Sequence, residues 1–322
     1  MIRTLYRNGR GSVTTDVPES HWKVALHDAS GLFWIDLAEV PDEQVRKILT
    51  DVFKFHPLAI EDAIRKAATP KIDDWGEYIY TVVHSVTFDA QTLDMDTHEV
   101  DCFLGKNFLV THHKNPNMSA DRVWKVAQRN EQYLARGADF LLYNILDTLA
   151  ADYMPVIDEL DEAIDHLEDA IFKKTTRTLL NQIFVIKRTV LHLRRIIIPQ
   201  REVMNRLARD TYAVVDASER VYFRDVYDHY VRLADINDTL RDLVGGALDT
   251  YLSVTSNRTN ETMKVLTIFS ALFLPISFVA GFFGMNFEKL PFASLEFLIV
   301  GLVVIALMPL TMLWWFKRQD WI

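Results

Sequence analysis

The amino-acid sequence predicts an α+β membrane protein, in which a mixed α/β domain precedes two membrane-spanning helices. Two stretches, 265–287 and 297–316, carry no charged residue. At about 1.5 Å per residue, helices of these lengths reach roughly 34 Å and 30 Å, which is enough to cross a bilayer. The 322-residue chain leaves room ahead of them for one sizeable domain.

Residues 1–135 are predicted to form the α/β domain. Strands are expected at 32–37, 78–88, 98–105 and 107–113, and helices at 42–55 and 57–66. Residues 78–88 are rich in β-branched and aromatic side chains, and Pro57 suits the first turn of a helix. His112 and His113 are a poor chelating pair, because adjacent strand positions point to opposite faces.

Residues 136–217 predict two helices of opposite charge. In the first, about 139–172, apolar residues recur at spacings of three and four, and the other face is acidic. Eight of its acidic residues fall within 152–169: Asp152, Asp158, Glu159, Asp161, Glu162, Asp165, Glu168 and Asp169. The second, 178–207, is basic, and Pro199 should end or kink it. An antiparallel pair would place opposite charges side by side. The acidic face is either a solvated surface or one that concentrates cations near a pore entrance.

Residues 218–287 are predicted to form one long helix that continues into the first span, with Gly245 and Gly246 as its weak point. One line along this helix steps by four and three through residues that are nearly all small or polar. Its members are Asp249, Ser253, Ser256, Asn260, Met263, Thr267, Ser270, Leu274, Ser277, Gly281 and Gly284. Small polar side chains gain nothing from contact with lipid, so the line should face other helices or water. The period of 3.5 residues favours a bundle of parallel copies. The line is therefore either a dry helix interface or, in an oligomer, the wall of a pore.

Charges near the spans predict the orientation of the chain. Residues 288–322 comprise a loop, the second span and a basic tail. Lys264 precedes the first span and Lys317 and Arg318 follow the second, so both ends of the chain are expected in the cytoplasm and the loop outside. No signal-peptide pattern opens the sequence, and Cys102 is the only cysteine, which fits a reducing compartment. The net charge of −9 argues against a nucleic-acid partner and suits cations.

The end of the first span carries a motif. The motif consists of Gly284, Met285 and Asn286 and is followed by Phe287. A short loop, the second span and a basic tail with Trp321 come after it. This arrangement resembles the CorA family of divalent-cation channels. Similar segments are FRDVYDH at 223–229, SNRTNETMKVL at 256–266 and FHPLAIED at 55–62. The resemblance implies a funnel-shaped homopentamer in the cell membrane, with the long helix lining a conduit for Mg²⁺, Co²⁺ or Ni²⁺.

The chemistry of Mg²⁺ sets what a filter must offer. The ion gives up water reluctantly and prefers oxygen ligands, so a filter for the hydrated ion should present neutral oxygens. By resemblance the selectivity filter is Gly284, Met285 and Asn286, with Gly284 carbonyls and Asn286 side chains as the oxygens. Further polar positions along the pore are Asn260, Thr267, Ser270, Ser277 and Gly281, with Asp249 as an acidic ring at the cytoplasmic end. Met263, Leu266 and Leu274 are expected to form apolar constrictions that gate by dewetting.

The resemblance also implies a cytoplasmic metal sensor. Asp89 and Asp225 match acidic residues that pair across the protomer interface, where a shared divalent ion stabilises two carboxylates. Metal binding would then favour the closed pore. Asp228 and His229 are further candidate ligands.

Two departures from the family pattern leave the ion open. Lys289 partly cancels Glu288 in the outer loop, and Leu274 and Ser277 stand where Met and Thr are expected. The alternative is a proton-coupled Zn²⁺ transporter like the ZntB branch of the same superfamily. A non-conducting membrane sensor or scaffold is a third interpretation. No P-loop, zinc-protease motif or nucleophile elbow is present, so no enzyme activity is expected.

Overall fold

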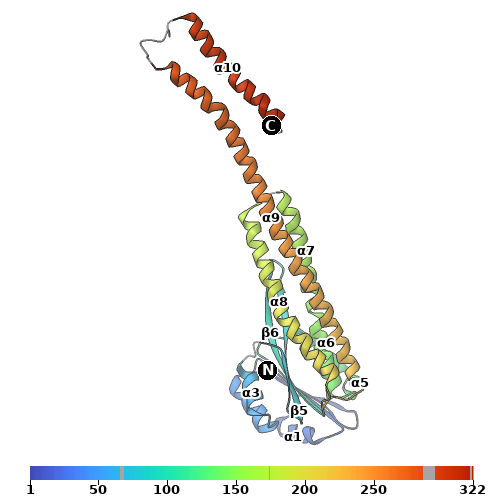
Figure 1. Cartoon of the computed structure of the whole chain (residues 1–322). Coiled ribbons are helices and arrows are strands. Elements are labelled where there is room, and N and C mark those ends of the chain that lie inside the picture. Colours follow the sequence, from blue (N-terminus) through green and yellow to red (C-terminus); the bar gives the residue numbers. More distant parts are fainter. Residues whose placement is uncertain (66–68, 174, 286–293, 320, 322) are drawn as a thin grey trace. The chain divides into compact units, whose positions relative to one another are not determined.

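The computed structural model describes residues 1–65, 69–173, 175–285, 294–319 and 321. These residues form two compact units, Met1–Leu248 and Asp249–Ile322. The division into four segments at 135, 217 and 287 stays a prediction. The α+β fold class is confirmed: an N-terminal domain built on a sheet is followed by a long helix and a C-terminal apolar helix (Figure 1).

The first unit is built on a seven-stranded mixed sheet. Its strands are β1 (Ile2–Arg7), β2 (Val13–Thr15), β3 (Leu32–Ala38), β4 (Lys71–Asp74), β5 (Tyr78–Asp89), β6 (Asp94–Gly105) and β7 (Phe108–His113). They lie in the order β2-β1-β3-β7-β6-β5-β4. Among the described strands, β3 and β7 form the one parallel pair, with Asp36 opposite Thr111. The strands predicted from the sequence are confirmed, whereas the short strands β1, β2 and β4 were not predicted.

One face of the sheet packs against short helices. These are α1 (Glu19–His27), α2 (Asp42–Lys47), the π-helical turn η1 (Ile48–Val52) and α3 (Pro57–Arg65). Because side chains alternate along a strand, Phe33, Ile35 and Leu37 of β3 point into this apolar core. The other face packs against α6 (Ala138–Ala151) and α8 (Arg177–Arg209). On that side Trp34 lies 4.6 Å, centroid to centroid, from Trp124 of α4 (Met118–Arg129), which precedes the short α5 (Glu131–Ala135).

A buried polar cluster joins the open edge of β5 to three helices. The β4 pairing reaches only Val82, so the backbone of His84 lies beyond the last paired residue of β4. The Gln200 side chain of α8 accepts a hydrogen bond from the His84 amide, and the Tyr153 hydroxyl donates to the His84 carbonyl at 2.7 Å. Gln200 also donates to the hydroxyls of Tyr230 at 2.7 Å and Tyr153 at 3.2 Å. Side chains of α7 (Tyr153–Lys173), α8 and α9 (Arg220–Phe283) therefore meet at one edge of the sheet.

The two charged helices differ from the prediction in two ways. The predicted helix 139–172 is interrupted at Asp152, which accepts hydrogen bonds from Ser119 and Arg122. The helix α8 spans Arg177–Arg209, close to the predicted 178–207, so Pro199 lies inside it and does not end it. The helices α7 and α8 pack together, yet among the described residues the bases of α8 form no ion pair with the acids of α7. Arg194 instead pairs with Asp238 of α9 at 3.0 Å.

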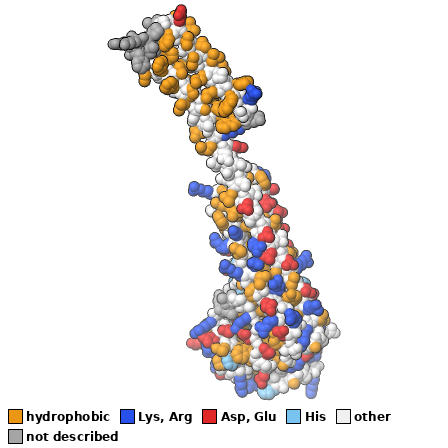
Figure 2. Space-filling model, in the orientation of Figure 1, with side chains coloured by type: hydrophobic (Ala, Val, Ile, Leu, Met, Phe, Trp, Pro, Cys, Tyr) orange, Lys and Arg blue, Asp and Glu red, His pale blue; other side chains and the backbone are white. Residues whose placement is uncertain are grey.

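The second unit contains the two membrane-length helices. The C-terminal part of α9 and α10 (Leu295–Arg318) are long and apolar enough to cross a membrane, and hydrophobic side chains cover them (Figure 2). The helix α9 continues through Gly245, Gly246 and Pro275 and ends at Phe283, four residues before the predicted end. Ser294 caps α10 by accepting a hydrogen bond from the amide of Phe297.

Candidate functional site

The polar line predicted on the long helix lies on one exposed face of α9. Every member from Asp249 to Gly284 is exposed in the single chain. Leu274 is 72% exposed and Met263 54%, although neither side chain is polar. Thr267 donates its hydroxyl to the Met263 carbonyl at 2.7 Å, so its oxygen keeps its acceptor capacity toward the outside of the helix.

The remaining faces of the same helix differ in character. Large exposed side chains flank the line at Val265, Phe269, Phe273 and Phe278, as expected for contact with lipid, and the predicted constriction residue Leu266 is also exposed. The half-buried residues are Ile268, Ala271, Leu272, Pro275, Ile276, Val279 and Phe283, at helical spacing. At Phe283 this half-buried face contacts Gly301 of α10. The polar line is therefore left without a partner among the described residues of a single chain.

The predicted filter lies at the end of this line. The amide of Gly284 donates to the Ala280 carbonyl at 3.0 Å, and the amide of Met285 donates to Phe282 at 3.2 Å, so the last turn of α9 tightens. Asn286 lies outside the described residues, and the roles of Gly284, Met285 and Asn286 stay predictions.

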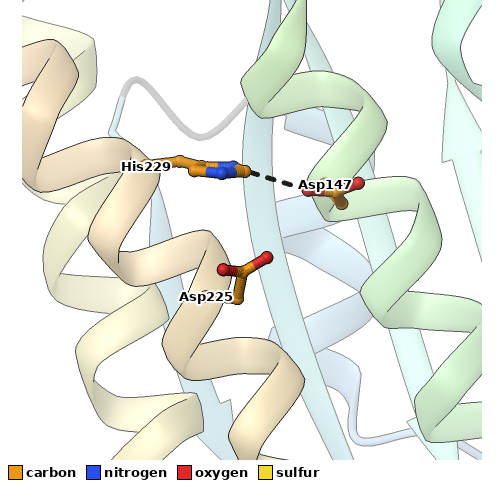
Figure 3. A group of neighbouring side chains, drawn as sticks. All are labelled: Asp147, Asp225 and His229. Carbon is orange, nitrogen blue, oxygen red and sulfur yellow. Dashed lines mark ion pairs between the residues drawn. The ribbon is translucent and has the colours of Figure 1, made fainter.

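A candidate metal site lies in the first unit. Asp147 of α6 and Asp225 and His229 of α9 place one ligand atom each within 4.8 Å of one another (Figure 3). The four-residue spacing puts Asp225 and His229 on one face of α9, and His229 Nδ1 lies 3.5 Å from an Asp147 carboxylate oxygen. Ligands at about 2.1 Å from an octahedral ion are at most about 4.2 Å apart, so a small contraction or a bridging water would let this group hold a divalent cation.

The electrostatics of the cluster favour a positive ion. Burial raises the pKa of the Asp147 carboxyl, and the neighbouring Asp225 raises it further, while His229 opposes the shift. Burial and then the charges of Asp147 and Asp225 also raise the pKa of the Tyr143 hydroxyl. A bound cation would relieve the repulsion between the two carboxylates, so metal and protons should compete for this site.

Asp89 occupies a different place in the single chain. It ends β5, and its carboxylate accepts a hydrogen bond from the Gln91 amide at 2.9 Å in the exposed β5–β6 turn. Hydrogen bonds from the backbone of Gln91 and the side chain of Thr92 lower the pKa of the Asp89 carboxyl. Within one chain, the described residues that group with Asp225 are Asp147 and His229. The pairing of Asp89 with Asp225 across a protomer interface stays a prediction.

The adjacent histidines point to different partners. His112 Nδ1 lies 3.0 Å from an Asp101 oxygen, whereas His113 Nε2 lies 3.3 Å from Asp36. Both pairs are buried. The expectation that these histidines would not chelate one ion together agrees with this geometry.

Sequence reasoning missed Asp147. It lies within the predicted acidic helix, and its neighbours Ile145 and Leu149 are buried. Helical spacing places Asp147 on the flank of the buried face but does not say which helix it meets. Only the packing of α6 beside α9 brings it to Asp225 and His229.

The fold defines a class: membrane proteins with an N-terminal α/β domain and two membrane-length helices. The comparisons make this specific. Residues 29–318 match the family model of the CorA-like Mg²⁺ transporter protein, and the chain belongs to this family of divalent-cation transporters.

Individual relatives extend the comparison. The cobalt/magnesium transport protein CorA of Thermotoga maritima is 33% identical over 311 residues, which cover 96% of this chain and 88% of the relative. The zinc transport protein ZntB of Yersinia pestis is 22% identical over 271 residues, or 83% of this chain and 81% of the relative. The complete structure of the CorA magnesium transporter from Methanocaldococcus jannaschii matches in fold, with a TM-score of 0.85 at 21% identity over 99% of this chain and 98% of that one.

Proposed function

We propose that the chain assembles as a homopentamer in the cell membrane and conducts Mg²⁺, with Co²⁺ and Ni²⁺ as further ions. The observation that supports this most is the exposed line on α9, which is polar or small at most positions although it continues through an apolar span. One chain supplies one such line, so an aqueous conduit needs several copies around an axis. Lys264, Lys317 and Arg318 favour cytoplasmic termini.

The filter would act on the hydrated ion. Carbonyl oxygens of Gly284 and side chains of Asn286 would accept hydrogen bonds from its water shell, which avoids the cost of dehydrating Mg²⁺. Rings of Leu274 and Met263 would form the apolar constrictions. Such rings block ions when they dewet and pass them when they hydrate.

The cluster of Asp147, Asp225 and His229 would be the regulatory site. Two of these residues lie on α9, which also carries the pore line. A cation bound there would tie α9 to α6 and favour the closed state, provided that it binds that state more tightly than the open one. The predicted contribution of Asp89 from a neighbouring protomer would add a further carboxylate.

The same cluster favours a second candidate, a Zn²⁺ transporter coupled to protons. His229 offers an imidazole nitrogen, which suits Zn²⁺, Co²⁺ and Ni²⁺ better than Mg²⁺. The pore line does not distinguish the two candidates, since it offers mainly oxygens.

Ion uptake into proteoliposomes tests the proposal. The full chain should take up Mg²⁺ down its gradient, without a requirement for a pH gradient. Uptake of Zn²⁺ that depends on an imposed pH gradient, with no Mg²⁺ uptake, would favour the second candidate. A protein that forms its oligomer but moves no divalent cation would contradict both.

Protease protection tests the regulatory site. Millimolar Mg²⁺ or Co²⁺ should slow proteolysis of the purified oligomer, and Asp147→Asn combined with Asp225→Asn should lose most of this protection. At 100 times the Kd, ligand binding adds about 2.7 kcal/mol of stability, so a clear difference in cleavage rate is expected. Asp235→Asn, on an exposed face of α9, is the matched control. Equal protection of the double variant and the wild type would rule the cluster out.

A further inference from the structure

The end of the pore helix is held by one aromatic ring in a notch on α10. A Cβ atom placed on Gly301 would lie 2.6 Å from Cζ of Phe283, and 2.9 Å and 3.0 Å from its Cε atoms. Gly301 is one of the two buried residues of α10, in a helix otherwise exposed or half-buried. The tip of the ring therefore rests directly on the backbone of α10, at a position where any larger residue would collide with it.

Neighbouring aromatic rings restrict the ring within this notch. Phe297 lies one helical turn before Gly301, on the same face of α10, and its ring centroid is 5.0 Å from that of Phe283. Phe282 packs edge-on against Phe283, with centroids 6.0 Å apart. With a ring on two sides and backbone at its tip, Phe283 cannot readily swing away to admit an extra atom.

Phe283 is also the last residue of α9 and is bonded directly to Gly284, the first residue of the proposed filter. The Gly284 amide stays hydrogen-bonded to Ala280, so the helix transmits the position of Phe283 to the Gly284 carbonyl. A methyl group at 301 would need about 1 Å more room to reach ordinary contact near 3.5 Å. A shift of that size is large for groups that must meet the water shell of an ion.

We propose that the Phe283 ring, seated against Gly301 and Phe297, is a positioning element that sets the height and orientation of the Gly284 carbonyl and thereby the ion selectivity of the pore. This rests on the proposed function of the filter. This contact adjoins the filter, because Phe283 directly precedes Gly284.

The chain offers a complementary pair of substitutions that tests the idea. Leucine lacks the ε and ζ atoms that the added methyl group would strike, so Phe283→Leu should relieve the clash created by Gly301→Ala. In proteoliposomes, Gly301→Ala should raise the KM for Mg²⁺ uptake, or change the Mg²⁺-to-Co²⁺ uptake ratio, by about 10-fold. Phe283→Leu alone should change them less, and the double variant should return to within about threefold of wild type, as expected for two residues in direct contact.

The measured quantities separate positioning from general packing. A change confined to the maximal rate, with KM and ion ratio unchanged in each variant, would show fewer working channels and would overturn the proposal. A double variant whose KM and ion ratio are no closer to wild type than those of Gly301→Ala would also overturn it.

Leu302→Ala, at the adjacent exposed position, is the control and should keep wild-type KM and ion ratio. If Gly301→Ala fails to assemble, wild-type values in Phe283→Leu would still refute the role of the ring. Wild-type protein without divalent uptake would refute the proposed function itself, whereas wild-type uptake with an unresponsive pair refutes only the positioning role.

Discussion

Replacing Gln200 by leucine should loosen the N-terminal domain at the edge of β5. The side chain is fully buried and makes three hydrogen bonds, to the His84 amide and to the hydroxyls of Tyr153 and Tyr230. Leucine has a similar volume but no polar atom, so the change leaves little cavity. Its effect should come almost entirely from the polar groups that lose their partner.

The structure gives the size of this effect. After Gln200→Leu, the Tyr153 hydroxyl can still donate to the His84 carbonyl. The His84 amide and the Tyr230 hydroxyl lose the partner that the structure gives them, in a dry environment. Each such buried group costs about 1–3 kcal/mol. For the two groups together, we therefore expect the free energy of unfolding to fall by about 2–6 kcal/mol.

Hydrogen exchange on the full chain, followed by mass spectrometry, measures this locally. A loss of about 3 kcal/mol corresponds to roughly 100-fold faster exchange, because every 1.4 kcal/mol is a factor of ten. Peptides that contain the amide of His84 should show it most strongly. Gln182→Leu, at an exposed position of the same helix, is the control and should leave exchange unchanged. Unchanged exchange around His84 in the Gln200 variant would refute the reasoning, since the cluster would then add nothing to stability.

Three further predictions concern the pore and the domain. Asn286→Ala should abolish divalent uptake while the oligomer still forms, and uptake at the parental rate would show that the filter lies elsewhere. Leu274→Ser should hydrate the proposed constriction and raise basal conductance in single-channel recordings, whereas an unchanged or lower conductance with normal expression would argue against dewetting there. Burial alone would raise the pKa of Asp36 and lower that of His113, but their hydrogen bond and opposite charges outweigh burial, so the pKa of Asp36 is lowered and that of His113 is raised. The pair should therefore stabilise the domain most between about pH 4 and 6.5. The stabilisation should be lost as pH falls through the folded pKa of Asp36 or rises through the folded pKa of His113. Urea unfolding at several pH values should show this maximum in the free energy of unfolding, and His113→Asn should flatten the maximum.

The fold was predictable where the sequence pattern is long. The uncharged spans and the long helix give a signal over many residues, and strand 78–88 is rich in β-branched and aromatic side chains. The short strands β1, β2 and β4 lack such a signal. The strand β2, for example, has only three residues and pairs only with β1 at the sheet edge. The strands β2 and β4 are the two edge strands, and each pairs only with the strand next to it in the chain.

Proline and charge in the sequence did not predict where α8 ends or which residues form ion pairs, because tertiary packing decides both. Pro199 lies inside α8, where the next residue, Gln200, anchors the helix to the sheet, so tertiary contacts outweigh the cost of the missing amide. Opposite charges on α7 and α8 predicted ion pairs between them. Arg194 instead reaches Asp238 on α9, because a third helix packs against the same pair. Helical spacing gives the face of a charge but not its partner.

The candidate metal site shows how the domain and the proposed pore can be linked. Asp225, His229 and Tyr230 are almost consecutive on α9: the first two contribute to the metal cluster and the third to the buried hydrogen bonds around Gln200. Metal at the cluster and hydrogen bonds at the sheet edge would therefore both restrain residues 225–230 of α9. The C-terminal part of the same helix carries the pore line. Any gating signal is limited by the difference in metal affinity between the two states, and shifting a closed fraction from 1% to 99% would need about 5.5 kcal/mol. One carboxylate pair and one imidazole per chain need not supply this alone, because five chains in the proposed pentamer would each add a share. About 1.1 kcal/mol per protomer would suffice, which lies within the range of ordinary allosteric coupling energies.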